Sequence, residues 1–311
     1  MTRSRATLRE VPQARCAGAV VLAVVVCSCQ SAAPASHAGP IQPRPDRSAR
    51  APQPREVPQA RVAAATSASS SAVVRSEPEA DAGVDAGLEA QGPWIDLPIE
   101  GHEPAVVSLP LGARGRVPVV VAAQGLGDNP LWWCAWWRER IGDRGFVLCP
   151  RGRVWGRLPS GAMGYAYTSA DELEREVLRG LEALAARYPA SVDPGPVLFG
   201  GFSMGATLGA TLVMRHPDRF PRAILVEGGN TEWNDRPAKA YANHGGQRIL
   251  FGCGTEGCLR WAKFAKRRLD RAGVQTRIAQ GEGGGHSYHD GPVSVALAEA
   301  FSWVLEGDAR W

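Results

Sequence analysis

From Trp94 onward, short apolar runs alternate with longer amphipathic stretches, and this alternation most constrains the fold. The runs are rich in β-branched residues, most are apolar throughout, and they lie near residues 104, 118, 145, 196, 223, 248 and 275. Uninterrupted apolar strands are typical of a parallel sheet that is buried on both faces. A strand followed by a helix, repeated along the chain, predicts an α/β fold with a doubly wound, mostly parallel sheet and helices on both faces.

Three of the amphipathic stretches have recognisable ends. Ser169 and Glu172 have the spacing of a capping box at a helix start, and Gly273 is a stop signal. The expected helices run from Ser169 to about Arg187, from about Cys258 to Ala272, and from near Pro292 to just before Gly307.

The chain before residue 93 contains little that could build a hydrophobic core. An arginine-bearing start leads into the apolar stretch 17–26, which is too short to span a bilayer, and this pattern predicts a signal peptide over residues 1–28. Residues 29–92 are rich in Ala, Pro, Ser and Arg with almost no aromatic side chains, so we expect a disordered tether. Residues 93–311 are predicted to form a single catalytic domain.

The end of the predicted signal peptide, Val26-Cys27-Ser28-Cys29, resembles the lipobox of bacterial lipoproteins. On this resemblance Cys29 becomes the mature N-terminus and carries a lipid anchor. Ser31 stands where an aspartate is associated with inner-membrane retention, which favours the outer membrane. We therefore expect an exported protein held at the cell envelope by lipid; the alternative is a secreted protein cut nearby without lipidation.

The formal charge of +4 comes mostly from this segment, since residues 1–28 hold four arginines and one glutamate. Without them the charge is about +1, from 31 basic and 30 acidic residues. Composition therefore gives no argument for nucleic acid or an anionic membrane as a partner, and no nucleic acid is expected.

The motif Gly201-Phe202-Ser203-Met204-Gly205 stands between an expected strand and an expected helix. A G-x-S-x-G motif in this context is typical of a nucleophile elbow. The two glycines leave room where the turn folds tightly, which lets Ser203 project in a strained conformation at the helix start. The helix N-terminus offers unpaired amide donors to an anion forming beside the serine. The motif therefore predicts Ser203 as a catalytic nucleophile.

At these residues the chain resembles the α/β-hydrolase superfamily of esterases, lipases and dienelactone hydrolases, and the resemblance runs from about residue 94 to the C-terminus. It implies a serine hydrolase without a cofactor, with a triad in the order nucleophile, acid, histidine. Gly283-Gly284-Gly285-His286 follows the last expected strand, where the family has its catalytic histidine. His286 is the predicted base, and His289 is the competing candidate.

Two glutamates stay open as the triad acid. In the family the acid most often follows the strand near 248, in a turn resembling G-T-x-D; here Gly257 stands at the aspartate position and Glu256 one residue earlier. Glu227, in L-V-E-G-G, lies at a strand end where some lipases place the acid. A carboxylate at such an apolar strand end needs a partner, and an imidazole would be one. Asp235 is a further candidate.

The loop Q-G-L-G-D-N-P at 124–130 resembles the family's H-G-x-G oxyanion loop, with Gln124 in place of histidine. Because main-chain amides do this chemistry, the N–H groups of Leu126 and Met204 are predicted to bind the oxyanion, at about 3 kcal/mol per donor. Four tryptophans that share one helical face follow: Trp132, Trp133, Trp136 and Trp137. We expect them to pack in the core, with one or two lining a substrate pocket as the alternative.

Four cysteines lie in the predicted domain, at 134, 149, 253 and 258. Export permits disulfides, and Cys253 and Cys258 bracket the G-T-E-G turn closely enough to bridge. Such a bridge would fix the turn that carries Glu256 and favour that acid. The pairing of Cys134 with Cys149 stays open. No histidine lies at ligand spacing from these cysteines, so no metal site is predicted.

Only about twenty residues separate L-V-E-G-G from the next strand, which leaves no room for a large cap domain. We expect an open site for a small-molecule or lipid-like acyl substrate. The predicted function is a metal-independent esterase that works through an acyl-enzyme. The alternatives are a catalytically weak surface lipoprotein with a binding or scaffold role, and a serine peptidase. The sequence sets neither the substrate nor the oligomeric state.

Overall fold

The computed structural model describes Leu88 and residues 92–311. The expected signal peptide over 1–28, the lipidation site Cys29 and nearly all of the expected tether lie outside the described residues. Within the described part of the chain, no helix has the length and apolar character needed to cross a membrane.

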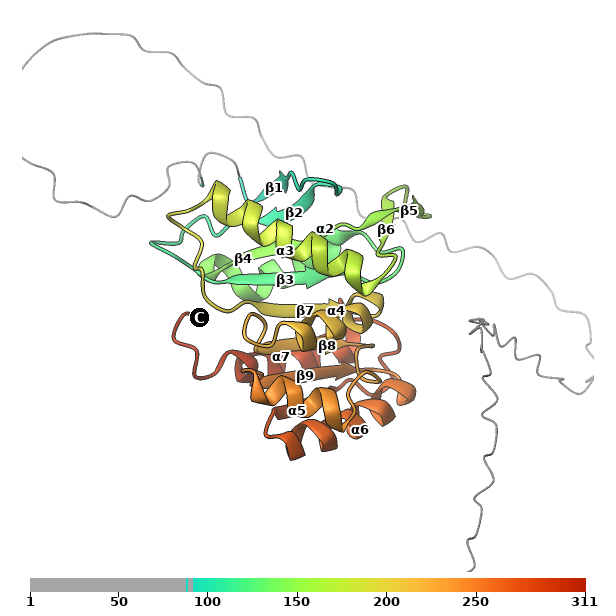
Figure 1. Cartoon of the computed structure of the whole chain (residues 1–311). Coiled ribbons are helices and arrows are strands. Elements are labelled where there is room, and N and C mark those ends of the chain that lie inside the picture. Colours follow the sequence, from blue (N-terminus) through green and yellow to red (C-terminus); the bar gives the residue numbers. More distant parts are fainter. Residues whose placement is uncertain (1–87, 89–91) are drawn as a thin grey trace, which may run out of the picture. The chain divides into compact units, whose positions relative to one another are not determined.

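An eight-stranded sheet forms the centre of this domain, in the order β1-β2-β4-β3-β7-β8-β9-β10 (Figure 1). β1 and β2 run antiparallel to their neighbours, and the six strands from β4 to β10 are parallel. The strands are β1 (Trp94–Leu97), β2 (Ala105–Ser108), β3 (Val119–Ala123), β4 (Phe146–Cys149), β7 (Leu198–Phe202), β8 (Arg222–Val226), β9 (Arg248–Cys253) and β10 (Gln275–Gln280). All seven expected strands are present, and β1 is an addition.

Helices cover both faces of the sheet, as the alternating pattern predicted (Figure 1). One face carries α3 (Ala170–Arg187), α4 (Met204–Arg215), α5 (Asp235–Asn243) and α6 (Glu256–Ala272). The other carries α2 (Pro130–Ile141), which a 3-10 turn, η1 (Gly142–Arg144), follows, and α7 (Gly291–Leu305). The segment between β8 and β9 contains α5 and no larger insertion, so the expectation of a fold without a large cap domain is confirmed.

The expected helix ends are close to the observed ones. Ser169 Oγ accepts the Glu172 N–H at 3.1 Å, but the Glu172 carboxylate turns to the Thr168 N–H at 2.7 Å instead of closing a reciprocal box. Gly273 ends α6 in a left-handed conformation with φ 94°. This conformation favours glycine, so the stop signal acts as predicted. α6 itself begins at Glu256, two residues earlier than expected.

Three of the four tryptophans on α2 are buried: Trp133, Trp136 and Trp137. Trp137 packs on β7 so closely that a Cβ at Gly200 would lie 2.0 Å from its indole ring. Trp132 differs, because its side chain is 44 % exposed. The core prediction is thus confirmed for three of them.

Two disulfides tie elements of the domain together. Cys134–Cys149 joins α2 to β4, a pairing the sequence left open. Cys253–Cys258 joins the end of β9 to the first turn of α6, as expected.

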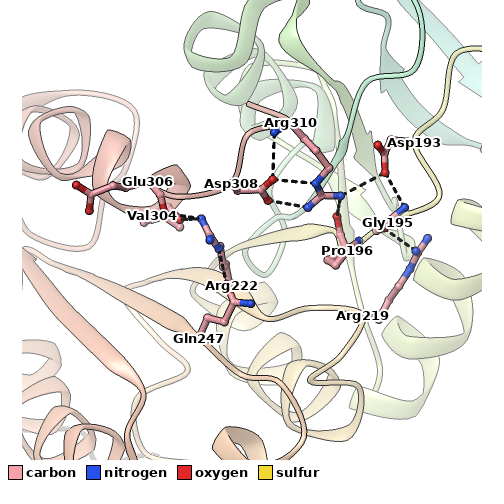
Figure 2. Close-up of polar contacts among 10 residues, drawn as sticks. All are labelled: Asp193, Gly195, Pro196, Arg219, Arg222, Gln247, Val304, Glu306, Asp308 and Arg310. Carbon is pink, nitrogen blue, oxygen red and sulfur yellow. Dashed lines mark hydrogen bonds and ion pairs between the residues drawn. The ribbon is translucent and has the colours of Figure 1, made fainter.

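A polar network at the start of β8 holds the C-terminal segment in place (Figure 2). The Arg222 guanidinium donates to the carbonyls of Val304 at 2.8 Å and Glu306 at 3.1 Å. Arg310 pairs with Asp308 at 2.7 Å and reaches Asp193 at 3.3 Å. The partly buried charges and carbonyls of this network are therefore matched, which avoids the cost of leaving them unpaired. Since Ser203 follows the carboxyl end of β7, this network lies at the opposite end of the parallel strands.

A small two-stranded sheet, β5 (Arg153–Arg157) and β6 (Met163–Ala166), stands apart from the main sheet (Figure 1). The sequence did not predict this hairpin. β5 is almost entirely exposed, so it lacks the apolar run by which the buried strands were found.

Candidate active site

Ser203 lies at the sharp turn between β7 and α4. Its backbone has φ 52° and ψ −112°, a strained conformation for a residue with a side chain. The turn leaves room only for glycine at position 205, because a Cβ there would lie 2.2 Å from the Ala123 carbonyl oxygen of β3. The expected elbow geometry around Ser203 is therefore present.

His286 lies in the loop between β10 and α7, and its Nε2 is 2.8 Å from Ser203 Oγ. The side chain is 52 % exposed, so the imidazole can be reached from solvent. The rival, His289, has its Nε2 3.8 Å from an Asp290 carboxylate oxygen and also lines the cleft that leads to Ser203. Of these two histidines, His286 is the one that the fold brings to the serine.

Glu227, the first residue after β8, completes a chain of contacts with Ser203 and His286. One carboxylate oxygen lies 3.3 Å from His286 Nδ1 and accepts the Thr255 hydroxyl at 2.8 Å. The other accepts the backbone N–H of Thr255 at 3.0 Å and that of Gly254. Burial raises the pKa of Glu227, but these hydrogen bonds outweigh it and hold the pKa below its ordinary value. The buried carboxylate therefore stays ionised while it faces the imidazole.

The other two candidate acids lie elsewhere. Glu256 is the first residue of α6, its side chain is exposed, and it lines a separate hollow with Arg260. Asp235 begins α5 and pairs with Arg271 at 2.7 Å. The Cys253–Cys258 bridge fixes the expected turn, but the turn supplies N–H donors to Glu227 instead of bringing Glu256 to His286. Within the described part of the chain, Glu227 is the carboxylate in contact with His286.

The loop after β3 lies directly against the serine. A Cβ at Gly125 would be 3.3 Å from Ser203 Cβ, and the Gly205 N–H donates to the Gln124 carbonyl at 3.0 Å. The N–H groups of Leu126 and Met204 have no hydrogen-bond acceptor among the described residues, so both are free for a ligand. The Gln124 side chain is fully buried and donates to the Arg151 carbonyl at 2.8 Å. It therefore anchors the loop from inside the core.

Tyr288 joins the loop between β10 and α7, which carries His286 and is called the histidine loop here, to the oxyanion loop. Sequence reasoning missed this residue. Its hydroxyl donates to Asp128 at 3.0 Å, and its ring packs on Phe202 and Trp133 with centroids 4.5 and 4.4 Å away. Burial, with Asp128 alongside, raises the pKa of this tyrosine, so it stays a neutral donor. No sequence pattern signals it, because its partner lies 160 residues away.

An open cleft of about 290 Å³ leads to Ser203 and His286. The oxyanion loop, Trp132, Leu158 and the histidine loop line it. A second hollow of about 500 Å³ adjoins it and shares Asp128, Trp132, Tyr288 and His289. Trp132 therefore lines the cleft, in agreement with the alternative expectation that one or two of the four tryptophans line a substrate pocket. In the described part of the chain, no group of three or more His, Cys, Asp or Glu side chains is placed to hold a metal ion.

No protein-family model and no curated protein matches this chain. Among solved structures, it is similar to the fluorophosphonate-binding serine hydrolase FphF of Staphylococcus aureus, with a TM-score of 0.51 and 15 % identity over 68 % of this chain and 96 % of that one. A putative dienelactone hydrolase of Klebsiella pneumoniae has a TM-score of 0.49 and 14 % identity over 68 % of this chain and 97 % of that one. An S-formylglutathione hydrolase of Agrobacterium tumefaciens has a TM-score of 0.49 and 17 % identity over 68 % of this chain and 93 % of that one.

The likeness to FphF concerns the fold. Together with the observed strand order and the turn at Ser203, it shows that the domain has the α/β-hydrolase fold, as expected. Fold alone does not define activity, which depends on the residues at the site.

Proposed function

We propose that this protein is a serine hydrolase that cleaves carboxylic esters or related acyl compounds through an acyl-enzyme. The single observation that carries the proposal is the chain of contacts from Ser203 Oγ to His286 Nε2 and from His286 Nδ1 to Glu227. Nucleophile, base and a carboxylate that orients the base are the parts such chemistry requires.

In the proposed reaction, His286 Nε2 takes the proton of Ser203 as the serine oxygen attacks the carbonyl carbon of the ester. The N–H groups of Leu126 and Met204 stabilise the resulting oxyanion. His286 then returns the proton to the leaving alcohol, which gives the acyl-enzyme. Water attacks the acyl-enzyme by the same route, with His286 again as base, and frees the acid. Glu227 holds the imidazole in the required orientation.

The test compares the purified protein with a Ser203→Ala variant. We expect the wild type to react with a fluorophosphonate probe and to hydrolyse short p-nitrophenyl esters, because its serine contacts a base. Ser203→Ala should abolish labelling and lower kcat by roughly four to six orders of magnitude. Ser302→Ala, at an exposed serine on α7, is the matched control and should behave as wild type. A folded wild-type protein that is neither labelled nor active contradicts the proposal.

The scaffold alternative rested on Gly257 at the position expected for the acid. The contact between Glu227 and His286 supplies a carboxylate from another strand end, which supports a complete triad over the scaffold alternative. For the peptidase alternative, no feature of the cleft favours a peptide over an ester.

We also propose that the protein is exported and lipid-anchored at Cys29. The two disulfides support export, because such bonds persist in oxidising compartments. Metabolic labelling with an alkyne-bearing palmitate should mark the wild-type protein and not Cys29→Ala; labelling of both would reject lipidation at this cysteine.

A further inference from the structure

Large apolar side chains are exposed around the mouth of the cleft. Among the described residues eight such side chains are exposed, and five of them lie on residues 126–132 and 154–155: Leu126, Leu131, Trp132, Val154 and Trp155. Trp155, on β5, is the most exposed of the eight at 64 %. Soluble proteins rarely gather exposed apolar side chains in one place unless something binds there.

Three of these residues, Leu126, Trp132 and Trp155, form one surface together with Leu158, and we call this surface the rim. A Cβ at Gly127 would lie 3.2 Å from Trp155, so the indole stands directly over the oxyanion loop. Leu126, Trp132 and Leu158 line the cleft that leads to Ser203. The rim, defined as Leu126, Trp132, Trp155 and Leu158, thus borders the opening of the site.

Backbone hydrogen bonds hold the hairpin in its place beside the cleft. The Gly127 N–H donates to the Tyr165 carbonyl at 2.8 Å, and the Tyr165 N–H donates to the Asp128 carbonyl at 2.9 Å. The Asn129 side chain adds a bond to the Met163 carbonyl at 2.9 Å. β6 therefore pairs with the oxyanion loop itself, although the hairpin stands outside the main sheet (Figure 1).

The exposed charge on the hairpin is positive. The hairpin itself, residues 153–166, contains two arginines and no acidic residue. Arg153 and Arg157 flank Trp155; the Arg153 side chain is 73 % exposed, whereas its partner Glu172 is only 5 % exposed. Arg157 donates to the Gly161 carbonyl at 2.7 Å. Tryptophan flanked by arginine is typical of segments that lie in the headgroup region of a bilayer, where the ring contacts acyl chains and the cation contacts phosphate.

Glu139 lies apart from the hairpin and pairs with Arg140 at 3.7 Å. Glu139 lines the adjoining hollow together with Trp132 and His289, and no hairpin residue lines that hollow. The near-neutral charge of the domain therefore conceals a local excess of basic side chains on the hairpin.

We propose that the rim, with Arg153 and Arg157, is a docking surface for an anionic lipid bilayer, which places the mouth of the cleft against the membrane. Apolar area supplies the attraction to the acyl region, and the arginines supply selectivity for anionic headgroups. Docking goes beyond the proposed hydrolase activity and is measured without turnover.

The test is sedimentation of the full-length protein with vesicles, in which every variant also carries Cys29→Ala so that the expected lipid anchor is absent. One vesicle type is phosphatidylcholine alone, and the other contains added phosphatidylglycerol. Trp155→Ser should weaken partitioning onto the anionic vesicles about tenfold, because the variant lacks the indole that would enter the bilayer. Arg157→Gln should weaken it about fivefold on anionic vesicles, with little change on phosphatidylcholine.

Trp261→Ser is the matched control, because Trp261 is 46 % exposed on α6, away from the hairpin. It should partition as the parent does, and thermal unfolding should confirm that all variants are folded. Docking through the rim is overturned if Trp155→Ser partitions like the parent, or if both tryptophan variants lose binding equally. A parent that is a dimer in solution and becomes monomeric on Trp155→Ser would assign the rim to a second copy of the chain, which also overturns the proposal.

Discussion

At the residue scale, backbone strain is concentrated in the residues that link Ser203, His286 and Glu227. Within the described part of the chain, two residues other than glycine have a positive φ, Ser203 and Glu227, both at 52°. Such conformations cost about 1–3 kcal/mol each and persist where the surrounding structure imposes them. Ser203 N donates to the Val226 carbonyl at 2.8 Å, and Glu227 N donates to the Gly252 carbonyl at 2.9 Å. The two strained turns are therefore locked to neighbouring strands.

Glu227→Gln should lower kcat by about three to four orders of magnitude, because the amide no longer stabilises the imidazolium or fixes its tautomer. The assay is hydrolysis of a short p-nitrophenyl ester under steady-state conditions. Glu256→Gln is the matched control and should retain wild-type kcat, since its side chain faces solvent. An equal loss in both variants would reject the role proposed for Glu227.

Sequence reasoning found Ser203 and His286 because each lies in a local pattern, the first between glycines and the second after a glycine run. It could not choose the acid, because the choice depends on strand register. Val226 pairs with Gly252 across β8 and β9, which places Glu227 beside the Gly254–Thr255 turn. That neighbourhood joins residues far apart in the chain, so no local pattern records it.

At the element scale, the turn between β9 and α6 connects the fold to the site. The helix begins at Glu256 with Thr255 as its cap, so the glutamate becomes part of the first helical turn. An acidic side chain there interacts favourably with the helix dipole, which explains its position without a catalytic role. The same turn presents its backbone N–H groups to Glu227.

Removing the Cys253–Cys258 bridge should therefore lower kcat, whereas removing the Cys134–Cys149 bridge should lower stability alone. The double variant Cys253→Ser/Cys258→Ser should lose roughly tenfold in kcat, because the donors to Glu227 become less well fixed and small misplacements are costly. The comparison is Cys134→Ala/Cys149→Ala, which should lose about 3 kcal/mol of unfolding free energy with kcat nearly unchanged. The reverse pattern in esterase assays and denaturant unfolding would contradict this division.

The sequence predicted seven strands of the sheet and five of the helices, all except α5, because buried strands and amphipathic helices have strong local patterns. It missed β1, which has four residues, and the exposed hairpin β5–β6. It also missed α5, a nine-residue helix that contains a proline. In each case contacts with neighbouring elements stabilise the structure more than the local sequence preference does.

At the scale of the whole molecule, stability should depend on pH through one buried carboxyl. Glu176 on α3 is fully buried and accepts the N–H groups of Arg151 at 2.7 Å and Gly152 at 3.0 Å. Burial raises its pKa from 4.5 to about 7, and these hydrogen bonds offset only part of the effect. Because the folded state binds the proton more tightly than the unfolded chain, the stabilisation is complete below about pH 4.5 and is lost as the pH rises towards 7.

The free energy of unfolding should therefore fall by roughly 3 kcal/mol from this group between about pH 4.5 and 7. Denaturant unfolding at a series of pH values measures it. Glu176→Gln should flatten the profile in this window, whereas Glu182→Gln, at an exposed position of the same helix, should leave it unchanged. Glu227 and Asp308 have lowered pKa values, so they stabilise the folded state when ionised. Their contribution to the free energy of unfolding is lost as the pH falls, below the window in which Glu176 acts. A wild-type profile that rises across this window would contradict the prediction.

The strained backbone at Ser203 and Glu227 also bears on how such a protein changes over generations. Glycine adopts a positive φ without strain, so replacement at either position relieves a conformational cost once hydrolysis is no longer under selection. Descendants that have lost the activity are therefore expected to accumulate glycine at these two positions before the sheet around them changes. A pair of glycines there, in an otherwise intact fold, would mark the loss of catalysis in a lineage.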